Sequence, residues 1–185
     1  KKCKKGNTIV NNASCTTNSV APIAQIMHES FGVKKAMLTT IHSVTAQQNM
    51  VDGIPPRHKP DLRRARAGFS NIVPTSTGAA NATTKVVKSL KNKFDGISVR
   101  VPSLDVSLTD FTFVTKKKTT LADVQSAFKK ASKSARWKKV VGVTNLPLVS
   151  TDFIQSPFAS VVDLDMIRVV DGDLVKVLAW YDNEW

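Results

Sequence analysis

The segment that most constrains this chain is a run of apolar residues at helical spacing that follows a cysteine. These residues recur at steps of three or four positions: Val20, Ile23, Met27 and Phe31. Such spacing is typical of one face of an amphipathic helix, and it predicts a helix from Thr16 to a stop near Gly32. The polar hexapeptide Ala13–Asn18 then contains the start of the helix.

Cys15 falls in the first turn of this predicted helix, among small hydroxyl residues. The first amides of a helix lack internal partners and carry a partial positive charge, which favours a thiolate over a thiol. The thiolate is the nucleophilic form, so we interpret Cys15 as a reactive residue. The alternative is that Cys15 packs as a small apolar side chain, as most unpaired cysteines do.

Length and composition indicate a globular protein with one domain. The 185 residues, 42% of them hydrophobic, suffice for a substantial core, and no apolar run is long enough to cross a bilayer. The charged start leads into no apolar segment of a secretory signal. Two cysteines, Cys3 and Cys15, make a poor disulfide framework, so we expect a reducing, cytoplasmic location.

The chain is strongly basic, with a formal net charge of +13. A basic face attracts phosphate, which makes a nucleic-acid-binding module one interpretation. However, the lysines stand in scattered runs without a recognisable binding motif or interleaved aromatic residues. We therefore do not expect nucleic acid as the primary partner, and the charge could instead steer small phosphorylated substrates.

The remaining pattern favours the α+β class, because strands outnumber helices and hairpins are indicated. Strands are expected at Ile9–Val10, Ala36–Thr45, Ile97–Pro102, Val106–Val114, Met166–Val170 and Leu174–Tyr181. Asp171-Gly172 indicates a hairpin between the last two. Two further helices are expected, one opening at Ser76–Gly78 and running past Leu90 to Phe94, the other starting at a Thr120–Asp123 capping box. Gln47–Arg66, rich in proline, is expected to form a long ordered loop.

His42 is the second candidate for chemistry. It lies 27 residues after the cysteine, on the strand to which the intervening helix returns. A strand–helix–strand unit could bring its imidazole beside the thiol. There it could deprotonate Cys15 and later act as an acid or base on the oxygen of a bound carbonyl. The alternative is that a single histidine in a strand is structural.

Six segments of the chain, in this order, resemble the phosphorylating glyceraldehyde-3-phosphate dehydrogenase family: Ala13–Asn18, Thr40–His42, Asp61–Arg66, Thr75–Ala80, Arg100–Pro102 and Trp180–Glu184. The set is specific although each motif alone is weak. The resemblance implies a catalytic domain over residues 1–185, with a mixed, largely antiparallel sheet and helices packed on one face. The family's N-terminal Rossmann domain and final C-terminal helix are expected to be absent from this chain.

The resemblance also implies a reaction for the intact, homotetrameric enzyme. Cys15 attacks the aldehyde of glyceraldehyde 3-phosphate, and His42 manages the proton. NAD accepts a hydride, with NADP not excluded, and a thioester on Cys15 results. Inorganic phosphate then releases the acyl group as 1,3-bisphosphoglycerate.

Binding roles follow from the same correspondence. The substrate's own phosphate is assigned to Thr45, Arg64 and Arg100. The attacking phosphate is assigned to Ser14, Thr16, Thr77 and Gly78, with Arg100 near both. Asn183 is assigned to the nicotinamide carboxamide, and no residue is assigned to a metal. The structural alternatives are helix capping for the three hydroxyl residues and a surface charge for Arg64.

Other functions stay open at this point. The erythrose-4-phosphate dehydrogenase branch shares much of the framework. The chain alone could act as a weak thiol esterase or acyl-phosphatase, because Cys15 and His42 need no cofactor to acylate and deacylate. A third possibility is a non-catalytic basic binding module. Ser19 stands where the family often has a second cysteine, and the Val44–Arg66 loop is longer than in common relatives.

If Cys15 is activated, iodoacetamide will alkylate it much faster than Cys3 near neutral pH. Mass spectrometry of the two tryptic peptides over time measures both rates in the folded chain. Equal rates would contradict the activated thiol.

Overall fold

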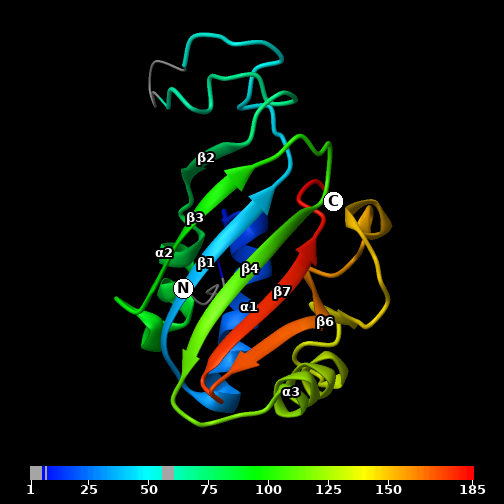
Figure 1. The fold of residues 1–185 in the computed structure, drawn as a ribbon. Coiled ribbons are helices and arrows are strands. Elements are labelled where there is room, and N and C mark those ends of the chain that lie inside the picture. The colour runs from blue at the N-terminus through cyan, green and yellow to red at the C-terminus, as the bar shows by residue number, and fades with distance from the viewer. Residues whose placement is uncertain (1–5, 7, 56–60) are drawn as a thin grey trace.

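Within the residues that the structure describes, 6, 8–55 and 61–185, seven strands form one mixed sheet in this computed structural model (Figure 1). The strands are β1 (Val33–His42), β2 (Val73–Ser76), β3 (Phe94–Arg100), β4 (Ser107–Thr115), β5 (Val141–Thr144), β6 (Ser160–Val170) and β7 (Leu174–Tyr181). They lie in the order β2-β3-β1-β4-β7-β6-β5. The pairs β1–β3 and β5–β6 are parallel, and the other four pairs are antiparallel. The expected mixed, largely antiparallel sheet is confirmed.

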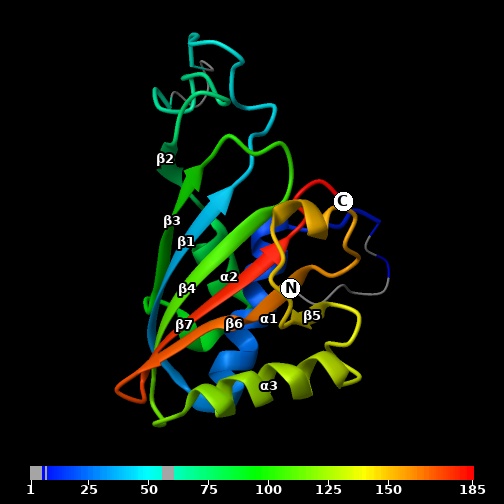
Figure 2. The same ribbon diagram turned by 45° about the vertical axis from the view of Figure 1, so that its right-hand side comes forward.

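The helices of the described part cover one face of this sheet (Figure 2). They are α1 (Cys15–Phe31), α2 (Ala79–Val86) and α3 (Leu121–Lys133), with short 3-10 helices η1 (Lys88–Leu90) and η2 (Ser150–Phe153). The opposite face of the sheet exposes side chains such as Met37 and Ile97. The expected α+β class with helices on one face is therefore confirmed. None of these helices combines the length and apolar character needed to cross a membrane.

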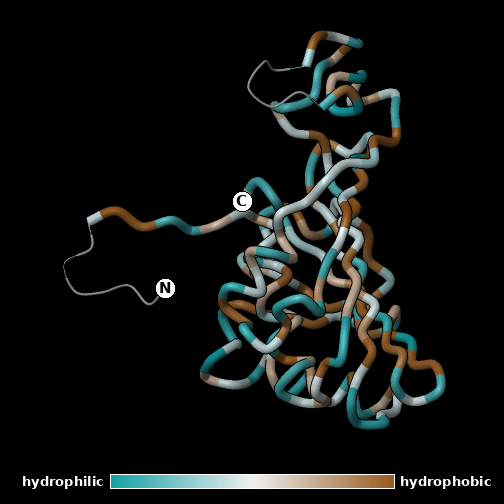
Figure 3. Tube along the Cα trace, turned by 90° about the vertical axis from the view of Figure 1, so that its left-hand side faces the viewer, coloured by the Kyte–Doolittle hydropathy of each residue, from teal (hydrophilic) through white to brown (hydrophobic). Residues whose placement is uncertain are grey.

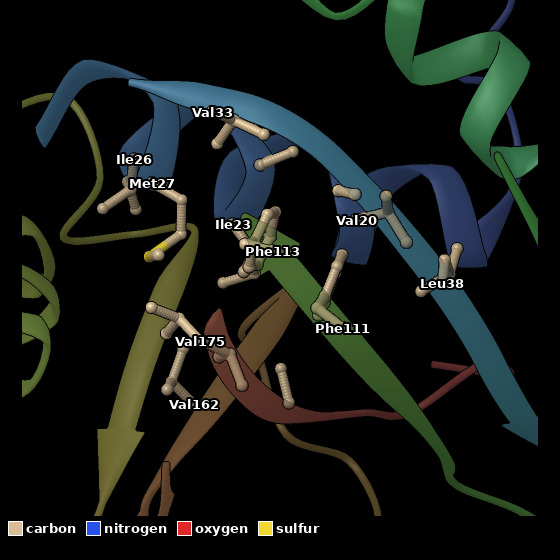
Figure 4. Close-up of a cluster of buried hydrophobic side chains, with 14 of the residues drawn as sticks. Val20, Ile23, Ile26, Met27, Val33, Leu38, Phe111, Phe113, Val162 and Val175 are labelled. Carbon is tan, nitrogen blue, oxygen red and sulfur yellow. The ribbon is translucent and has the colours of Figure 1, made fainter. Parts of the chain in front are cut away.

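The core lies between α1 and the middle of the sheet (Figure 4). The predicted apolar face of α1 is buried there, with Val20, Ile23 and Met27 fully inaccessible to solvent. From β4, Phe111 and Phe113 stack with ring centroids 5.3 Å apart and complete the layer. Burial of such side chains is the main stabilising contribution to a fold of this kind. This packing fixes where α1 starts, and so where the thiol lies.

The predicted helix start at Thr120–Asp123 and the predicted hairpin turn at Asp171-Gly172 are both confirmed by the structure. At the start of α3, the Asp123 N–H donates to Thr120 Oγ1 and the Thr120 N–H donates to Asp123 Oδ2, at 3.2 and 3.0 Å. Between β6 and β7, Asp171 and Gly172 have φ values of 46° and 69°. Two consecutive residues with positive φ are typical of one common class of hairpin turn, whose twist matches that of the flanking strands.

Some predicted elements are wrong. Ile9 and Val10 form no strand; they are 90% and 70% exposed, and their segment leads away from the body of the molecule (Figure 3). The helix that opens after Gly78 ends at Val86 instead of running on to Phe94. Phe94 opens β3, because it pairs with Ala36 in parallel register. Tertiary pairing overrides the helical spacing of this segment.

The long segment after β1 is a loop, as expected, over its described residues 47–55 and 61–66. Two contacts tie its sides together: a bridge between Asn49 and Ala67, and an ion pair between Arg66 and Asp52 at 2.8 Å. Residues 56–60 at the tip, and Cys3 near the start of the chain, lie outside the described residues. The four-residue strands β2 and β5 were not expected from the sequence.

Truncation of Phe111 to alanine will destabilise the fold by about 3–5 kcal/mol, because it leaves a cavity under α1. Urea unfolding followed by circular dichroism measures this change. Val170→Ala, at a 57% exposed position of β6, is the control and will shift the free energy by less than about 0.5 kcal/mol. Similar effects of both substitutions would contradict the assigned core.

Candidate active site

Cys15 lies in the first turn of α1, as the sequence predicted, and is its first residue, one position before the predicted start. Ser14 is the N-cap, and its Oγ accepts a hydrogen bond from the Thr17 N–H at 3.0 Å. Ala13 precedes it with φ at 61°, a left-handed value that alanine rarely adopts. This turn and cap hold the thiol at the positive end of the helix, where an anion is stabilised.

His42 lies beside the thiol, and its tautomer is set by the backbone. Its Nδ1 is 2.8 Å from the carbonyl oxygen of Ser43, and its Nε2 is 3.8 Å from Sγ of Cys15. A carbonyl oxygen only accepts hydrogen bonds, so Nδ1 must carry the proton. The lone pair of Nε2 therefore faces the thiol and can take its proton. The two predicted catalytic residues are brought together.

The imidazole is neutral at physiological pH. Burial lowers the pKa of His42 from 6.5 to about 4, and the positive charges of Arg100 and Arg64 act in the same direction. The hydrogen bond to Ser43 opposes this shift only in part. A neutral histidine next to a thiol can act as a base, whereas an imidazolium could not.

Tyr181 supports this pair from β7. Its ring meets that of His42 edge to face, with centroids 6.1 Å apart and planes at 79°. Its hydroxyl lies 2.9 Å from Oγ1 of Thr16, and burial raises the pKa of this hydroxyl, so it stays protonated. Thr16 thus bonds a side chain of the sheet and does not cap the helix. Sequence reasoning did not assign a role to Tyr181, although it lies inside a recognised motif.

Arg100 lies next to His42 because β1 and β3 pair in parallel with these two residues in register. Its Nη1 donates to Thr45 Oγ1 at 3.1 Å and to the Ser43 carbonyl at 3.2 Å. Its Nε is buried and has no hydrogen-bond partner among the described residues. A buried donor of this kind is costly unless a ligand satisfies it. An oxyanion would do so.

Arg64 reaches the same region from the long loop. Its guanidinium donates to Thr75 Oγ1 at 2.8 Å and to the Ser76 carbonyl at 3.0 Å. Asp61 lies 3.3 Å from its Nε, and the Arg64 side chain is only 18% exposed. The contacts lock the guanidinium toward β2, so the alternative of a freely solvated surface charge is wrong.

These groups surround one cavity of about 360 Å³. Most of the predicted site residues line it: Ser14, Cys15, Thr16, His42, Arg64, Thr77, Gly78 and Arg100. Thr45 is not in the lining but bonds to Arg100. Gly78 is the N-cap of α2, and the Thr77 hydroxyl accepts from the Ala79 N–H at 3.2 Å. Two helix starts and two guanidiniums therefore face this cavity, and no carboxylate of the described chain lines it.

Asn183 lies outside that lining and is held by two serines. Its Oδ1 accepts from Ser43 Oγ at 2.8 Å and from Ser107 Oγ at 2.6 Å. Its Nδ2 is buried and lacks a partner within the described part of the chain. This arrangement leaves the NH2 group of Asn183 free to donate to a carbonyl oxygen, such as that of a ligand carboxamide.

Sequence reasoning missed several polar residues that build the site: Thr17, Ser43, Ser98, Ser107 and Tyr181. Ser43 is adjacent to His42, and Thr17 lies in the hexapeptide Ala13–Asn18. Their position next to predicted site residues was the one signal in the sequence that could have identified them. Ser98, Ser107 and Tyr181 lie on strands whose pairing the sequence did not define.

Comparison with known proteins gives a match to the family described as glyceraldehyde 3-phosphate dehydrogenase, C-terminal domain, over residues 14–183. Glyceraldehyde-3-phosphate dehydrogenase of Zymomonas mobilis is 48% identical over 96% of this chain and 51% of its own length. The chloroplastic dehydrogenase B of Pisum sativum is 47% identical over 96% of this chain and 38% of its own. The cytosolic glyceraldehyde-3-phosphate dehydrogenase of Scenedesmus vacuolatus is 42% identical over 98% of this chain and 57% of its own length. The chain spans about half the length of the relatives it matches.

The lowered pKa of His42 predicts a pH dependence of stability. The folded state binds this proton only below about pH 4 and the unfolded state binds it below about 6.5, so stability falls as pH drops through this window. We expect a loss of about 3 kcal/mol between pH 7 and pH 4 that the His42→Gln variant lacks. Urea unfolding of both proteins measures the difference, and parallel pH profiles would contradict the buried neutral imidazole.

Proposed function

Because the chain belongs to the glyceraldehyde 3-phosphate dehydrogenase family and matches its C-terminal domain, we propose that it carries the catalytic half of a phosphorylating dehydrogenase. The proposed reaction converts glyceraldehyde 3-phosphate to 1,3-bisphosphoglycerate through a thioester on Cys15. The observation that carries this proposal is the Sγ–Nε2 distance of 3.8 Å beside a cavity lined by two arginines. A nucleophile with its base, next to an anion site, fits a phosphorylated aldehyde.

The chain's own residues account for the proton movements. The Sγ of Cys15 bonds to the aldehyde carbon while Nε2 of His42 takes the thiol proton and returns it to the carbonyl oxygen. When the hemithioacetal is oxidised to the thioester, Nε2 takes the hydroxyl proton. Phosphate oxygen then attacks the thioester carbon, and the Sγ–C bond breaks to release the acyl phosphate. The departing thiolate takes back the proton from Nε2, which regenerates the Cys15 thiol and the neutral His42.

Two phosphate groups must bind for this reaction. We assign the substrate's own phosphate to Thr45, Arg64 and Arg100, and the attacking phosphate to the hydroxyls and amides of Ser14, Thr16, Thr77 and Gly78. The hydrogen bond of 3.1 Å between Arg100 and Thr45 supports the first group, because it holds the two side chains together before a ligand binds. The α1 and α2 starts support the second, because helix N-termini attract phosphate.

The cofactor would be NAD, with NADP not excluded, and it would supply the hydride acceptor. Within this chain Asn183 would hold its carboxamide. The unpartnered Nδ2 supports this assignment, because Ser43 and Ser107 leave that amide donor free to meet a carbonyl oxygen.

A homotetramer and a cytoplasmic location remain predictions. The relative from Scenedesmus vacuolatus is named as cytosolic and the one from Pisum sativum as chloroplastic, so sequence similarity to these proteins does not determine the location of this chain. Among the other candidates, erythrose-4-phosphate dehydrogenase is not favoured by relatives that are all named for glyceraldehyde 3-phosphate. A thiol esterase activity of the chain alone is favoured by one observation, that Cys15 and His42 are paired within it.

The proposed reaction will appear when the chain is joined behind the N-terminal half of the Zymomonas mobilis relative. We expect NADH formation that requires both glyceraldehyde 3-phosphate and phosphate, and its loss by at least about a thousandfold in the Cys15→Ser variant, because the nucleophile is removed. A folded fusion that binds NAD but forms no NADH would contradict the dehydrogenase assignment. Phosphate-independent ester hydrolysis instead would indicate the thiol esterase.

Phosphate will protect Cys15 from iodoacetamide in the chain itself, and the Arg100→Ala variant will need at least about tenfold more phosphate for half protection. The reason is the loss of charged hydrogen bonds to the anion. Alkylation rates at increasing phosphate concentration measure this. Arg168→Ala, which removes an arginine outside the cavity, is the matched control. Unchanged protection in Arg100→Ala would contradict its role in anion binding.

A further inference from the structure

A carboxylate stands directly behind one of the two arginines of the thiol cavity. Asp61 lies three residues before Arg64 in the long loop, and its Oδ2 is 3.3 Å from Nε of that arginine. Arg64 lines the cavity and Asp61 does not, so the carboxylate approaches the guanidinium from outside the anion site. The proposed reaction gives Asp61 no role.

The Asp61 carboxylate joins the long loop to β2. Its Oδ1 accepts hydrogen bonds from the backbone N–H groups of Arg63 and Arg64, at 3.1 and 3.3 Å. Its Oδ2 accepts from the hydroxyl of Thr75 at 2.8 Å, and Thr75 lies on β2, where it is 8% exposed. One side chain therefore fixes both the turn that carries Arg64 and the position of that turn against the sheet.

The Thr75 hydroxyl connects this carboxylate to the guanidinium. A hydroxyl has one hydrogen to donate and lone pairs with which to accept. Because Thr75 donates its hydrogen to Asp61, a lone pair of its Oγ1 is left to accept from Nε of Arg64, which lies 2.8 Å away. Without Asp61 the hydroxyl could rotate, and the acceptor for Nε would no longer be fixed.

The other bonds of the Arg64 guanidinium leave part of it free for an anion. Nη1 donates to Gln47 Oε1 at 2.9 Å, and Nη2 donates to the Ser76 carbonyl at 3.0 Å. A guanidinium has five N–H groups, so these two bonds and the one to Thr75 leave one N–H on each Nη atom without a partner among the described residues. Such N–H groups are what a phosphate oxygen binds.

The charge of Asp61 makes its position near an anion site costly. The hydrogen bond from Thr75 lowers the pKa of Asp61, and the backbone N–H groups of Arg64 and Arg63 act in the same direction. Asp61 is therefore ionised at neutral pH, and its charge repels a nearby anion. If Asp61 acted through its charge alone, its removal would strengthen phosphate binding, whereas the removal of an orienting residue would weaken it.

We propose that Asp61 is a positioning residue that acts through Thr75 to aim Arg64 at a bound phosphate. This inference rests on the proposed function, because it takes the cavity as the phosphate site of that reaction. A long side chain that is held in its binding conformation before the ligand arrives loses less conformational entropy on binding. The bond from Arg64 to Ser76, two residues before the N-cap of α2, would also keep the two proposed phosphate subsites in a fixed relation.

The test measures the concentration of inorganic phosphate that half protects Cys15 of the chain from iodoacetamide. Asp61→Asn removes the charge, and with it a strong acceptor for the Thr75 hydroxyl, at nearly constant volume. We expect this variant to need at least about fivefold more phosphate. Asp52→Asn is the matched control, because it removes a carboxylate of the same loop that pairs with Arg66 outside the cavity, and it should change the concentration by less than about twofold.

Two further variants test the path through Thr75. Thr75→Val keeps the shape of the side chain but removes the hydroxyl, and it should also need at least about fivefold more phosphate. Thr75→Ser keeps the hydroxyl and should stay within about twofold of the wild type. This pair keeps the test valid if Asp61→Asn disturbs folding, which circular dichroism reveals.

A double variant separates positioning from a general structural role. If Asp61 acts through Arg64, the Asp61→Asn substitution should cause no further weakening in the Arg64→Ala background, because the group that it orients is already gone. A merely structural role would weaken phosphate binding in both backgrounds.

Three results would overturn the proposal while leaving the phosphate site intact. The first is half protection of Asp61→Asn at the same or a lower phosphate concentration than the wild type needs. The second is an equal loss in Thr75→Ser and Thr75→Val, and the third is an undiminished effect of Asp61→Asn in the Arg64→Ala background. If phosphate did not protect the wild-type chain at all, the phosphate site of the proposed function would be contradicted, and this proposal with it.

Discussion

The hydrogen bond from Nδ1 of His42 to the Ser43 carbonyl is the contact on which the candidate chemistry depends. At 2.8 Å it fixes the proton on Nδ1, and so leaves the lone pair of Nε2 directed at Cys15. The same carbonyl accepts from Arg100, so one backbone oxygen orients both the base and an anion-binding guanidinium. With the opposite tautomer, the ring would present an N–H to the thiol and could not take its proton.

The direction of the strands brings the remaining groups to one end of the sheet. The strands β1, β3 and β7 run in the same direction, and their last residues at that end are His42, Arg100 and Tyr181. The α1 start meets them there, because its buried apolar face sets the position of the helix against β4. The core thus places a nucleophile, a base and positive charge together around one cavity.

Much of this arrangement could be predicted because it is encoded locally. The spacing of α1, the Thr120–Asp123 capping box and the Asp171-Gly172 turn each need only a few neighbouring residues, and the return of the chain after α1 correctly placed His42 beside Cys15. Features that depend on pairing with distant strands were missed or wrong. The strands β2 and β5 are too short to show an alternating pattern. Phe94 was assigned to a helix because it follows the helical spacing of the residues before it, whereas it pairs with β1 as a strand residue. Tyr181 contacts Thr16 only because the sheet brings the two residues together. The roles of the anion-binding residues rest on family correspondence and remain proposals.

The tautomer and charge of His42 can be observed directly by nitrogen NMR of protein labelled in its histidines. The His42→Gln variant identifies the signal of His42 among the three histidines of the chain. At neutral pH we expect a neutral ring with a protonated Nδ1 and an unprotonated Nε2. An imidazolium, or a ring protonated at Nε2 alone, would contradict the account of Cys15 and its base.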